Sequence, residues 1–327
     1  MDNKLTKKRL SDFLAYEWII TIVAVVAVII VWELIYTVSA ARLSVGQLFK
    51  YYMDEDLYYY DGSSRDVYSL LGVETGRNGK TFSYDVLSVE TENLNSSYNV
   101  LSVRLSVQEG DAIFTSSAEK EDGTERVKNI IDNFSVYDME SLLESAKRYL
   151  TKFVKAGGDI YTAADYDENK IRDYFDARMK GDNRFRSEKD KEEGRQNEIA
   201  RIRKLAADVK DFETLMTVGE EKGLFYKYTK YEQSATSVDN EDVRAAYERE
   251  KTNGKENLVY GFNMAAMTHD PLRTDKKNVS DYLKLAGGNA DGVVLCLFDF
   301  AKEQPDLQYE SISFVCTLAR EFSDFLG

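Results

Sequence analysis

The longest apolar run lies near the beginning of the chain, from Trp18 to Trp32, and contains no charged residue. Glu33 follows it, and mostly apolar residues then continue to Ala41. A helix needs about 20 mostly apolar residues to cross the ~30 Å hydrocarbon core of a bilayer. Tryptophan at both ends of such a run is typical of membrane interfaces. The pattern therefore predicts one transmembrane helix over residues 18–41.

The apolar run has two alternative interpretations. The first is a cleaved signal peptide, because Val38-Ser39-Ala40 has the small residues of a cleavage site, with cleavage after Ala40. The run is longer than the ~7–15 apolar residues of a signal peptide, which favours an uncleaved signal-anchor. The second is a buried core helix, which would normally carry a polar stripe.

The flanking charges predict the orientation of the chain. Four basic residues precede the run and only two follow it closely, namely Lys4, Lys7, Lys8 and Arg9 before it and Arg42 and Lys50 after it. Cytoplasmic flanks of membrane helices carry an excess of lysine and arginine. We therefore expect residues 1–17 in the cytoplasm and residues 42–327 outside it, in a single-pass protein of the cell membrane.

Residues 42–327 alternate between strand-like and helix-like patterns. Strands are predicted over 81–89, 98–107, 112–114, 257–264 and 292–300, and a strand or an aromatic turn over 224–231. Helices are predicted from 129 to the Gly157-Gly158 pair and over 165–179, 199–216, 241–251, 279–285 and 312–326. Residues 62–80 are predicted as loop, and the charged stretch 180–197 as a solvated loop or helix face. The run at 292–300 is the most apolar strand, as expected at the centre of a covered sheet. Interleaved strands and helices predict an α/β architecture.

The charge and the rare residue types narrow the function classes. The formal net charge of −14 argues against nucleic acid and against anionic headgroups as partners. The single histidine, His269, excludes a zinc site of several histidines, and it lies in a turn-like Thr-His-Asp-Pro sequence. Gly-x-Ser-x-Gly and phosphate-loop motifs are absent from the sequence. We therefore expect a protein that is not an enzyme and binds no cofactor or metal. Cys296 and Cys316 either form a disulfide or are buried free thiols.

Three stretches carry a resemblance to a known family: Glu109–Ser117, Val259–Met264 and Tyr309–Phe322. They resemble parts of the extracellular solute-binding proteins that serve ABC importers. The first stretch resembles an early strand that faces the cleft, the second resembles the strand that enters the second lobe, and the third resembles the late helices. The resemblance implies a two-lobed fold like that of the periplasmic binding proteins, with the ligand between the lobes. The chain departs from the family in lacking a lipidation cysteine near residue 40 and in having only two prolines.

The resemblance and the strand ends together predict a binding site. Ligands of open α/β sheets bind where strand ends meet a cleft. Ser116, Ser117, Tyr260 and Asn263 are therefore predicted to contact a small-molecule ligand such as a sugar or a peptide. The predicted function is a membrane-tethered extracytoplasmic solute-binding protein that works with the subunits of a membrane transporter.

Two alternative functions remain open at this stage. The first is a single-span interaction or scaffold subunit of a membrane assembly, suggested by Glu33 at the edge of the apolar run. The second is a hydrolase with two facing carboxylates ~5–9.5 Å apart, for which the sequence gives no spacing.

Overall fold

The computed structural model describes residues 7–12, 18–39, 48–54, 57–59, 88–94, 98–107, 109–182, 185, 187–237, 239–273, 276, 278–279, 283–285, 291–299 and 309–326. The predicted loop at 62–80 lies outside these residues. The chain divides into two compact units, Met1–Ser44 and Val45–Gly327.

The first unit contains two helices, α1 (Lys7–Asp12) and α2 (Trp18–Ser39). The predicted transmembrane helix over 18–41 is wrong: in the part of the chain that the structure describes, no helix combines the length and the apolar character needed to cross a bilayer. The uncharged run Trp18–Trp32 gives only about 22 Å of helix, against ~30 Å of hydrocarbon. The predicted span depended on the residues after Glu33 for the remaining length.

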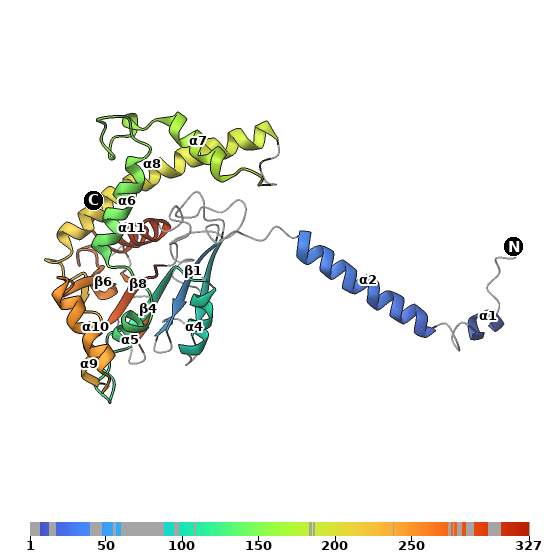
Figure 1. Ribbon diagram of the computed structural model, residues 1–327, viewed down its shortest axis with the longest axis horizontal. Coiled ribbons are helices and arrows are strands. Elements are labelled where there is room, and N and C mark those ends of the chain that lie inside the picture. The colour runs from blue at the N-terminus through green and yellow to red at the C-terminus, as the bar shows by residue number, and fades with distance from the viewer. Residues whose placement is uncertain are drawn as a thin grey trace. The chain divides into compact units, whose positions relative to one another are not determined.

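The second unit is built on a mixed sheet of six strands (Figure 1). Their order is β3-β1-β4-β8-β6-β5, with β1 (Leu48–Met53), β3 (Ser88–Asn93), β4 (Ala112–Ser116), β5 (Phe225–Tyr228), β6 (Leu258–Asn263) and β8 (Val293–Leu297). Strand β1 is parallel to β3 and to β4, whereas β8 is antiparallel to both β4 and β6. A separate antiparallel pair joins β2 (Leu57–Tyr59) to β7 (Leu283–Leu285).

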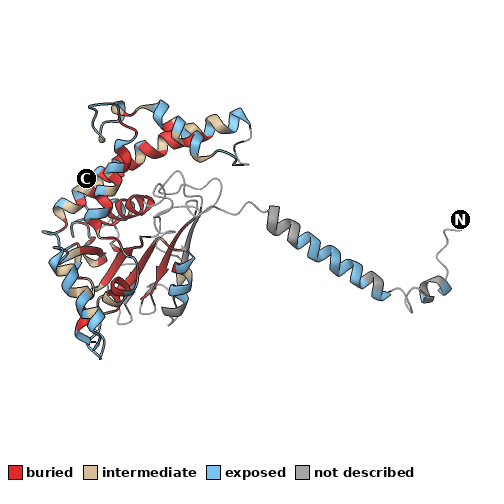
Figure 2. Cartoon of the chain, in the orientation of Figure 1, coloured by how far each residue is buried: buried red, intermediate tan, exposed pale blue. Residues whose placement is uncertain are grey.

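Helices cover both faces of the six-stranded sheet. The larger apolar cluster, here the large core, lies under α6 (Met139–Thr151), α8 (Glu188–Val218) and α11 (Glu310–Phe322). The smaller cluster, here the small core, lies under α4 (Tyr98–Ser106) and α5 (Arg126–Asn133). Strand β8 supplies both: Leu295 belongs to the large core and Cys296 to the small one, as the two-residue period of a strand requires. The predicted central, fully buried strand is confirmed, and the inner strands β4 and β8 are buried along their whole length (Figure 2).

The remaining helices are α7 (Glu168–Arg178), α9 (Glu232–Ser237) and α10 (Glu241–Thr252), with short 3-10 turns at Ala163–Asp165 and Met264–Ala266. The predicted helices at 165–179, 199–216, 241–251 and 312–326 are confirmed. The helical pattern from 129 is divided between α5 and α6, with a break at residues 134–138.

Two element predictions are wrong. Residues 98–107 were predicted as a strand, but α4 is a helix whose Leu101 and Leu105, four residues apart, point into the small core. Residues 279–285 were predicted as a helix, but Leu283–Leu285 forms strand β7 paired with β2.

The expected two-lobed fold is also wrong. Residues 45–327 form one compact unit, and within its described residues the six strands from β1 to β8 belong to one sheet. The stretch Val259–Met264 was expected to lead into a second lobe. It forms β6 of the same sheet instead, hydrogen-bonded between β8 and β5. A cleft between two lobes is therefore not the place to look for a site in this unit.

Candidate functional site

The structure brings three of the four predicted ligand residues to one end of the sheet. Ser116 ends β4 and is paired with Val293 of β8, and Asn263 ends β6 and is paired with Val294. Ser117 follows Ser116 directly. Tyr260 lies in the middle of β6, and its ring belongs to the small core, so it is not part of the same edge.

Each of these four side chains has a contact within the protein. Ser116 Oγ accepts a hydrogen bond from the Ala118 backbone N–H at 3.0 Å, and Ser117 Oγ donates to the Gly292 carbonyl at 3.2 Å. Asn263 Nδ2 donates to two carbonyl oxygens of the segment leading into β5, those of Gly223 and Phe225. Tyr260 is buried, and this burial raises the pKa of its hydroxyl. The four side chains therefore have structural roles here, and their role as ligand contacts stays a prediction.

A buried ion pair lies at the same edge of the sheet. Asp54, which follows β1, accepts hydrogen bonds from Arg126 Nε at 2.9 Å and Arg126 Nη2 at 2.9 Å. Thr115 on β4 donates its hydroxyl to the same carboxylate at 2.7 Å. The side chains of Arg126 and Asp54 are 7% and 1% exposed. The Asp54 carboxylate, at the edge where an open α/β sheet usually admits a ligand, is thus paired with the protein's own side chains.

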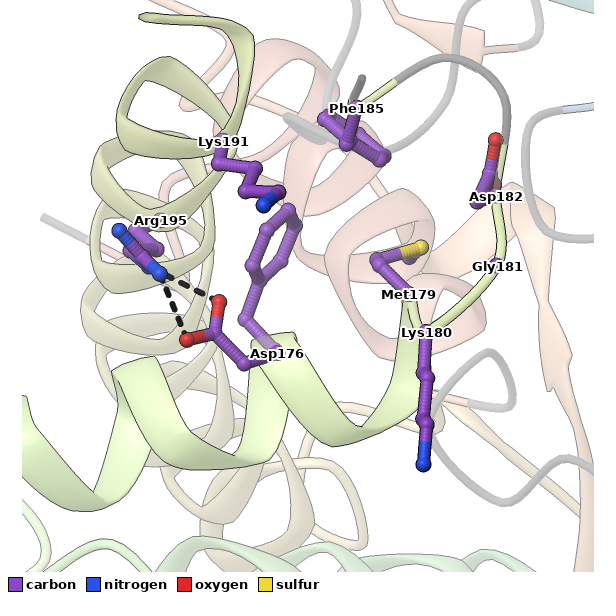
Figure 3. A pocket seen from close by; sticks show the side chains of 9 residues that line it. Asp176, Met179, Lys180, Gly181, Asp182, Phe185, Lys191 and Arg195 are labelled. Carbon is purple, nitrogen blue, oxygen red and sulfur yellow. Dashed lines mark hydrogen bonds and ion pairs between the residues drawn. The ribbon is translucent and has the colours of Figure 1, made fainter. Parts of the chain in front are cut away.

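A cavity of about 440 Å³ lies elsewhere, at the end of the helical hairpin formed by α7 and the first turns of α8. Figure 3 shows its lining residues, which come from the end of α7, the following turn and α8. They are Phe175, Asp176, Met179, Lys180, Gly181, Asp182, Phe185, Lys191 and Arg195. The cavity thus combines three apolar side chains with charged ones.

A glycine in α8 allows the apolar floor of the cavity to form. A Cβ atom at Gly194 would lie 2.3 Å from the Phe175 ring and 2.7 Å from the Phe185 ring. Because Gly194 has no side chain, both rings lie directly against the backbone of α8. The two rings meet edge to face, with centroids 5.0 Å apart. Met179 adds a flexible thioether to this floor.

Charged side chains surround the floor in fixed pairs. Arg195 holds Asp176 with two hydrogen bonds of 2.8 and 2.7 Å, and these bonds lower the pKa of the Asp176 carboxyl. Beside them, the hydrogen bond from Arg172 lowers the pKa of Glu192 to about 2. All of these carboxylates are therefore ionised at neutral pH. A bidentate arginine–carboxylate pair orients both side chains more firmly than a single contact does.

The two lysines of the cavity differ in direction. In Figure 3 the Lys191 side chain projects from α8 at the side of the cavity, whereas Lys180 points away from it. Lys191 is paired with Glu188 at 2.7 Å, three residues earlier, and the Glu188 side chain is 78% exposed. Such exposed pairs contribute only about 0–1 kcal/mol, so Lys191 is free to exchange its partner at little cost.

This cavity was not predicted from the sequence, because six of its nine lining residues lie in the stretch 180–197, predicted as a solvated loop or helix face. Two residues within that stretch were informative. Phe185 is the only aromatic residue among its charges, and Gly194 stands within a run that continues as a helix. A glycine inside a helical pattern often marks a close packing contact.

The residues considered for catalysis and redox chemistry have structural contacts. His269 Nδ1 and Nε2 each lie 2.9 Å from an oxygen, of the Asp324 carboxylate and the Glu321 carbonyl respectively. Cys296 and Cys316 are buried free thiols in different cores, which decides the cysteine question against a disulfide. Burial raises the pKa of both thiols, which disfavours the reactive thiolate. Among the described residues there is no group of three or more metal-ligating side chains.

Comparison with known proteins gives no relative: neither protein-family models nor curated proteins nor solved structures match this chain. The function must therefore be argued from the site alone.

Proposed function

We propose that this protein is a non-catalytic interaction protein that binds a segment of a partner protein in the α7–α8 cavity. The observation that carries the proposal is the cavity itself: an apolar floor of Phe175, Met179 and Phe185 within a rim of ionised side chains. An apolar centre with a polar rim is the usual anatomy of a protein interface. The sequence suggested a different interaction function, that of a single-span subunit of a membrane assembly without its own ligand; the present proposal instead places a partner segment in a cavity.

The chemistry of the lining supports binding over catalysis. Its titratable groups are Asp176, Asp182, two lysines and Arg195, without a serine, cysteine or histidine. The Asp176 carboxylate accepts two hydrogen bonds from Arg195, and this pairing opposes a role as a general base. A volume of about 440 Å³ suits one or two side chains of a bound segment, within the ~300–1,000 Å³ range of ligand pockets.

Solute uptake with an ABC importer, and location at the cell membrane, stay predictions. Solute uptake was expected to use a cleft between two lobes, and residues 45–327 form one compact unit instead. An interaction function needs no second lobe, and a surface cavity on a helical hairpin suffices for it. For this reason we favour interaction with a partner protein.

A peptide selection tests the proposal. The full-length protein is used to select binders from a displayed library of random peptides, and the dissociation constants of the synthetic peptides are measured by fluorescence anisotropy. Met179→Glu places a carboxylate on the apolar floor and should weaken binding at least tenfold. The matched control is Leu272→Glu, the same kind of change at a side chain that is 88% exposed and does not line the cavity.

Circular dichroism and thermal unfolding establish that both variants are folded. The proposal is supported when Met179→Glu alone loses affinity. It is overturned if selection yields no peptide, or if the selected peptides bind Met179→Glu as tightly as the unchanged protein.

A further inference from the structure

We infer that the partner segment is anchored in the cavity by an aromatic side chain. This inference rests on the proposed function, since it names the chemistry of the segment that the same site accepts. The cavity presents three kinds of group that favour an aromatic ring over an aliphatic side chain of similar size: two aromatic rings, a thioether and two cations.

The floor provides the first two kinds of group. Phe175 and Phe185 already meet edge to face at 5.0 Å. Phe175 is buried and Phe185 is partly exposed, so a third ring would extend this cluster through Phe185. Aromatic pairs in such arrangements contribute ~0.5–1.5 kcal/mol beyond the area that they bury. The sulfur of Met179 lies beside the same space and makes favourable contacts with ring edges. An aliphatic side chain would gain only the free energy of burying its apolar area.

The rim provides the cations. Lys191 lines the cavity and projects from α8 at its side in Figure 3. Its ammonium group is paired with the exposed Glu188, so it can turn over a ring bound on the floor at little cost. A cation over a ring face contributes ~0.5–1 kcal/mol at exposed sites. The guanidinium of Arg195 is planar and is fixed by Asp176. A guanidinium that is paired in its plane still offers its face for stacking on an aromatic ring.

A larger group of rings packs together in the large core of this protein. Phe49, Tyr51 and Phe114 surround Phe314 in the large core, at centroid distances from 4.8 to 6.4 Å. There the protein supplies every ring itself. In the α7–α8 cavity the floor has two rings and open space beside them, and an incoming ring would complete an equivalent group.

The test uses peptides from the selection that differ only at the anchor position, which an alanine scan of the peptide identifies. Phenylalanine, cyclohexylalanine and leucine are compared there. Cyclohexylalanine matches phenylalanine in size and apolar area but has no π system. We expect phenylalanine to bind about threefold to tenfold more tightly than cyclohexylalanine, as 0.5–1.5 kcal/mol implies.

Lys191→Met supplies the second measurement. Methionine keeps an apolar stem and removes the ammonium group, and Lys191 is half-exposed, so folding should be unaffected. The preference for phenylalanine over cyclohexylalanine should shrink in this variant, whereas it should be unchanged in Lys180→Met, since Lys180 points away from the cavity. Equal affinities for phenylalanine and cyclohexylalanine, with binding still lost in Met179→Glu, would overturn the aromatic anchor and leave the proposed function standing. Absence of peptide binding at the cavity would overturn both.

Discussion

The buried pair of Asp54 and Arg126 gives the sharpest test of how this fold is held together. The two side chains are 72 residues apart in sequence and join the end of β1 to the start of α5. Arg126 is the first residue of α5, where the helix dipole disfavours a cation. The Asp54 carboxylate offsets this and accepts three hydrogen bonds from the guanidinium, with the longest at 3.1 Å.

Replacing Arg126 by methionine removes the charge and keeps most of the apolar volume. Asp54 then loses its guanidinium partner at a side chain that is 1% exposed. Breaking a buried pair from one side costs about 3–5 kcal/mol. For a unit of this size, that corresponds to a fall in the melting temperature of roughly 5–8 °C.

The double variant Asp54→Leu, Arg126→Met removes both charges and should recover most of the loss. Thr115 would still lack the carboxylate that accepts its hydroxyl at 2.7 Å, which costs about 1 kcal/mol. The double variant should therefore be about 1 kcal/mol less stable than the unchanged protein, and clearly more stable than Arg126→Met alone.

Arg203→Met is the matched control, because Arg203 pairs with Glu168 at 2.6 Å but both side chains are more than 40% exposed. The same substitution there should change the free energy of unfolding by less than 1 kcal/mol. Urea unfolding followed by circular dichroism measures all four proteins, since both tryptophans lie in α2 and the unit that contains the sheet has none. A loss below 1 kcal/mol in Arg126→Met, or no recovery in the double variant, would refute the argument.

Two further predictions concern the cavity and the end of α11. Gly194→Ala should gain ~1 kcal/mol from helix propensity, but the new Cβ atom should force the Phe175 and Phe185 rings into the cavity. The selected peptides should therefore bind this variant at least tenfold more weakly, as measured by fluorescence anisotropy. The control is Asn197→Ala, at an exposed position of the same helix, which should leave the peptide affinity unaltered. Asp324 has its pKa lowered to about 2, first by the hydrogen bond with His269 and then by the Asp270 N–H and Arg273. A depressed carboxyl pKa stabilises the fold above the unfolded value of ~3.9 and loses this effect as the pH falls toward 2. The urea midpoints of the unchanged protein and Asp324→Asn should therefore differ at about pH 6 and converge as the pH is lowered to about 2; a constant difference would contradict this assignment.

The elements that could be predicted from the sequence are those whose burial leaves a simple pattern. Strand β8 lies at the interior of the sheet, and Val293–Leu297 are all buried, so its apolar run could be assigned without knowing its neighbours. In α8, Ile202, Leu205 and Val209 recur at helical spacing and are buried against the large core. These assignments depend on local periodicity alone.

Helix α4 shows where periodicity fails. Its sequence alternates well enough that Val103, Leu105 and Val107 seemed to form one face of a strand. The structure buries Leu101 and Leu105 and leaves Val103 and Val107 exposed. Over ten residues both periods fit, and the choice depends on what lies beneath. Leu101 and Leu105 pack beside Ile113 and Val127 of other elements, which the local pattern does not contain.

Predicting the candidate site from the sequence would also have required contacts between residues that are far apart in the chain. Strand-end reasoning led to Ser116, Ser117 and Asn263, and the structure does place these three at one edge of the sheet. At that edge Arg126 is paired with Asp54, and a pairing between residues 72 positions apart has no signature in the sequence. The strand ends could be located from the sequence and the buried ion pair beside them could not, and ligand binding by the three residues stays a prediction.

Gly194 shows how part of the cavity could have been found. A glycine inside a helix costs ~1 kcal/mol relative to alanine, so its presence within 31 helical residues suggests a contact that a side chain would obstruct. Aromatic residues at positions 175 and 185 lie within twenty residues before it, close enough for a helical hairpin to return them to the same place. The sequence therefore indicates a close approach to α8 at Gly194. Which rings approach it, and that their arrangement leaves space for another side chain, depends on the turn between α7 and α8.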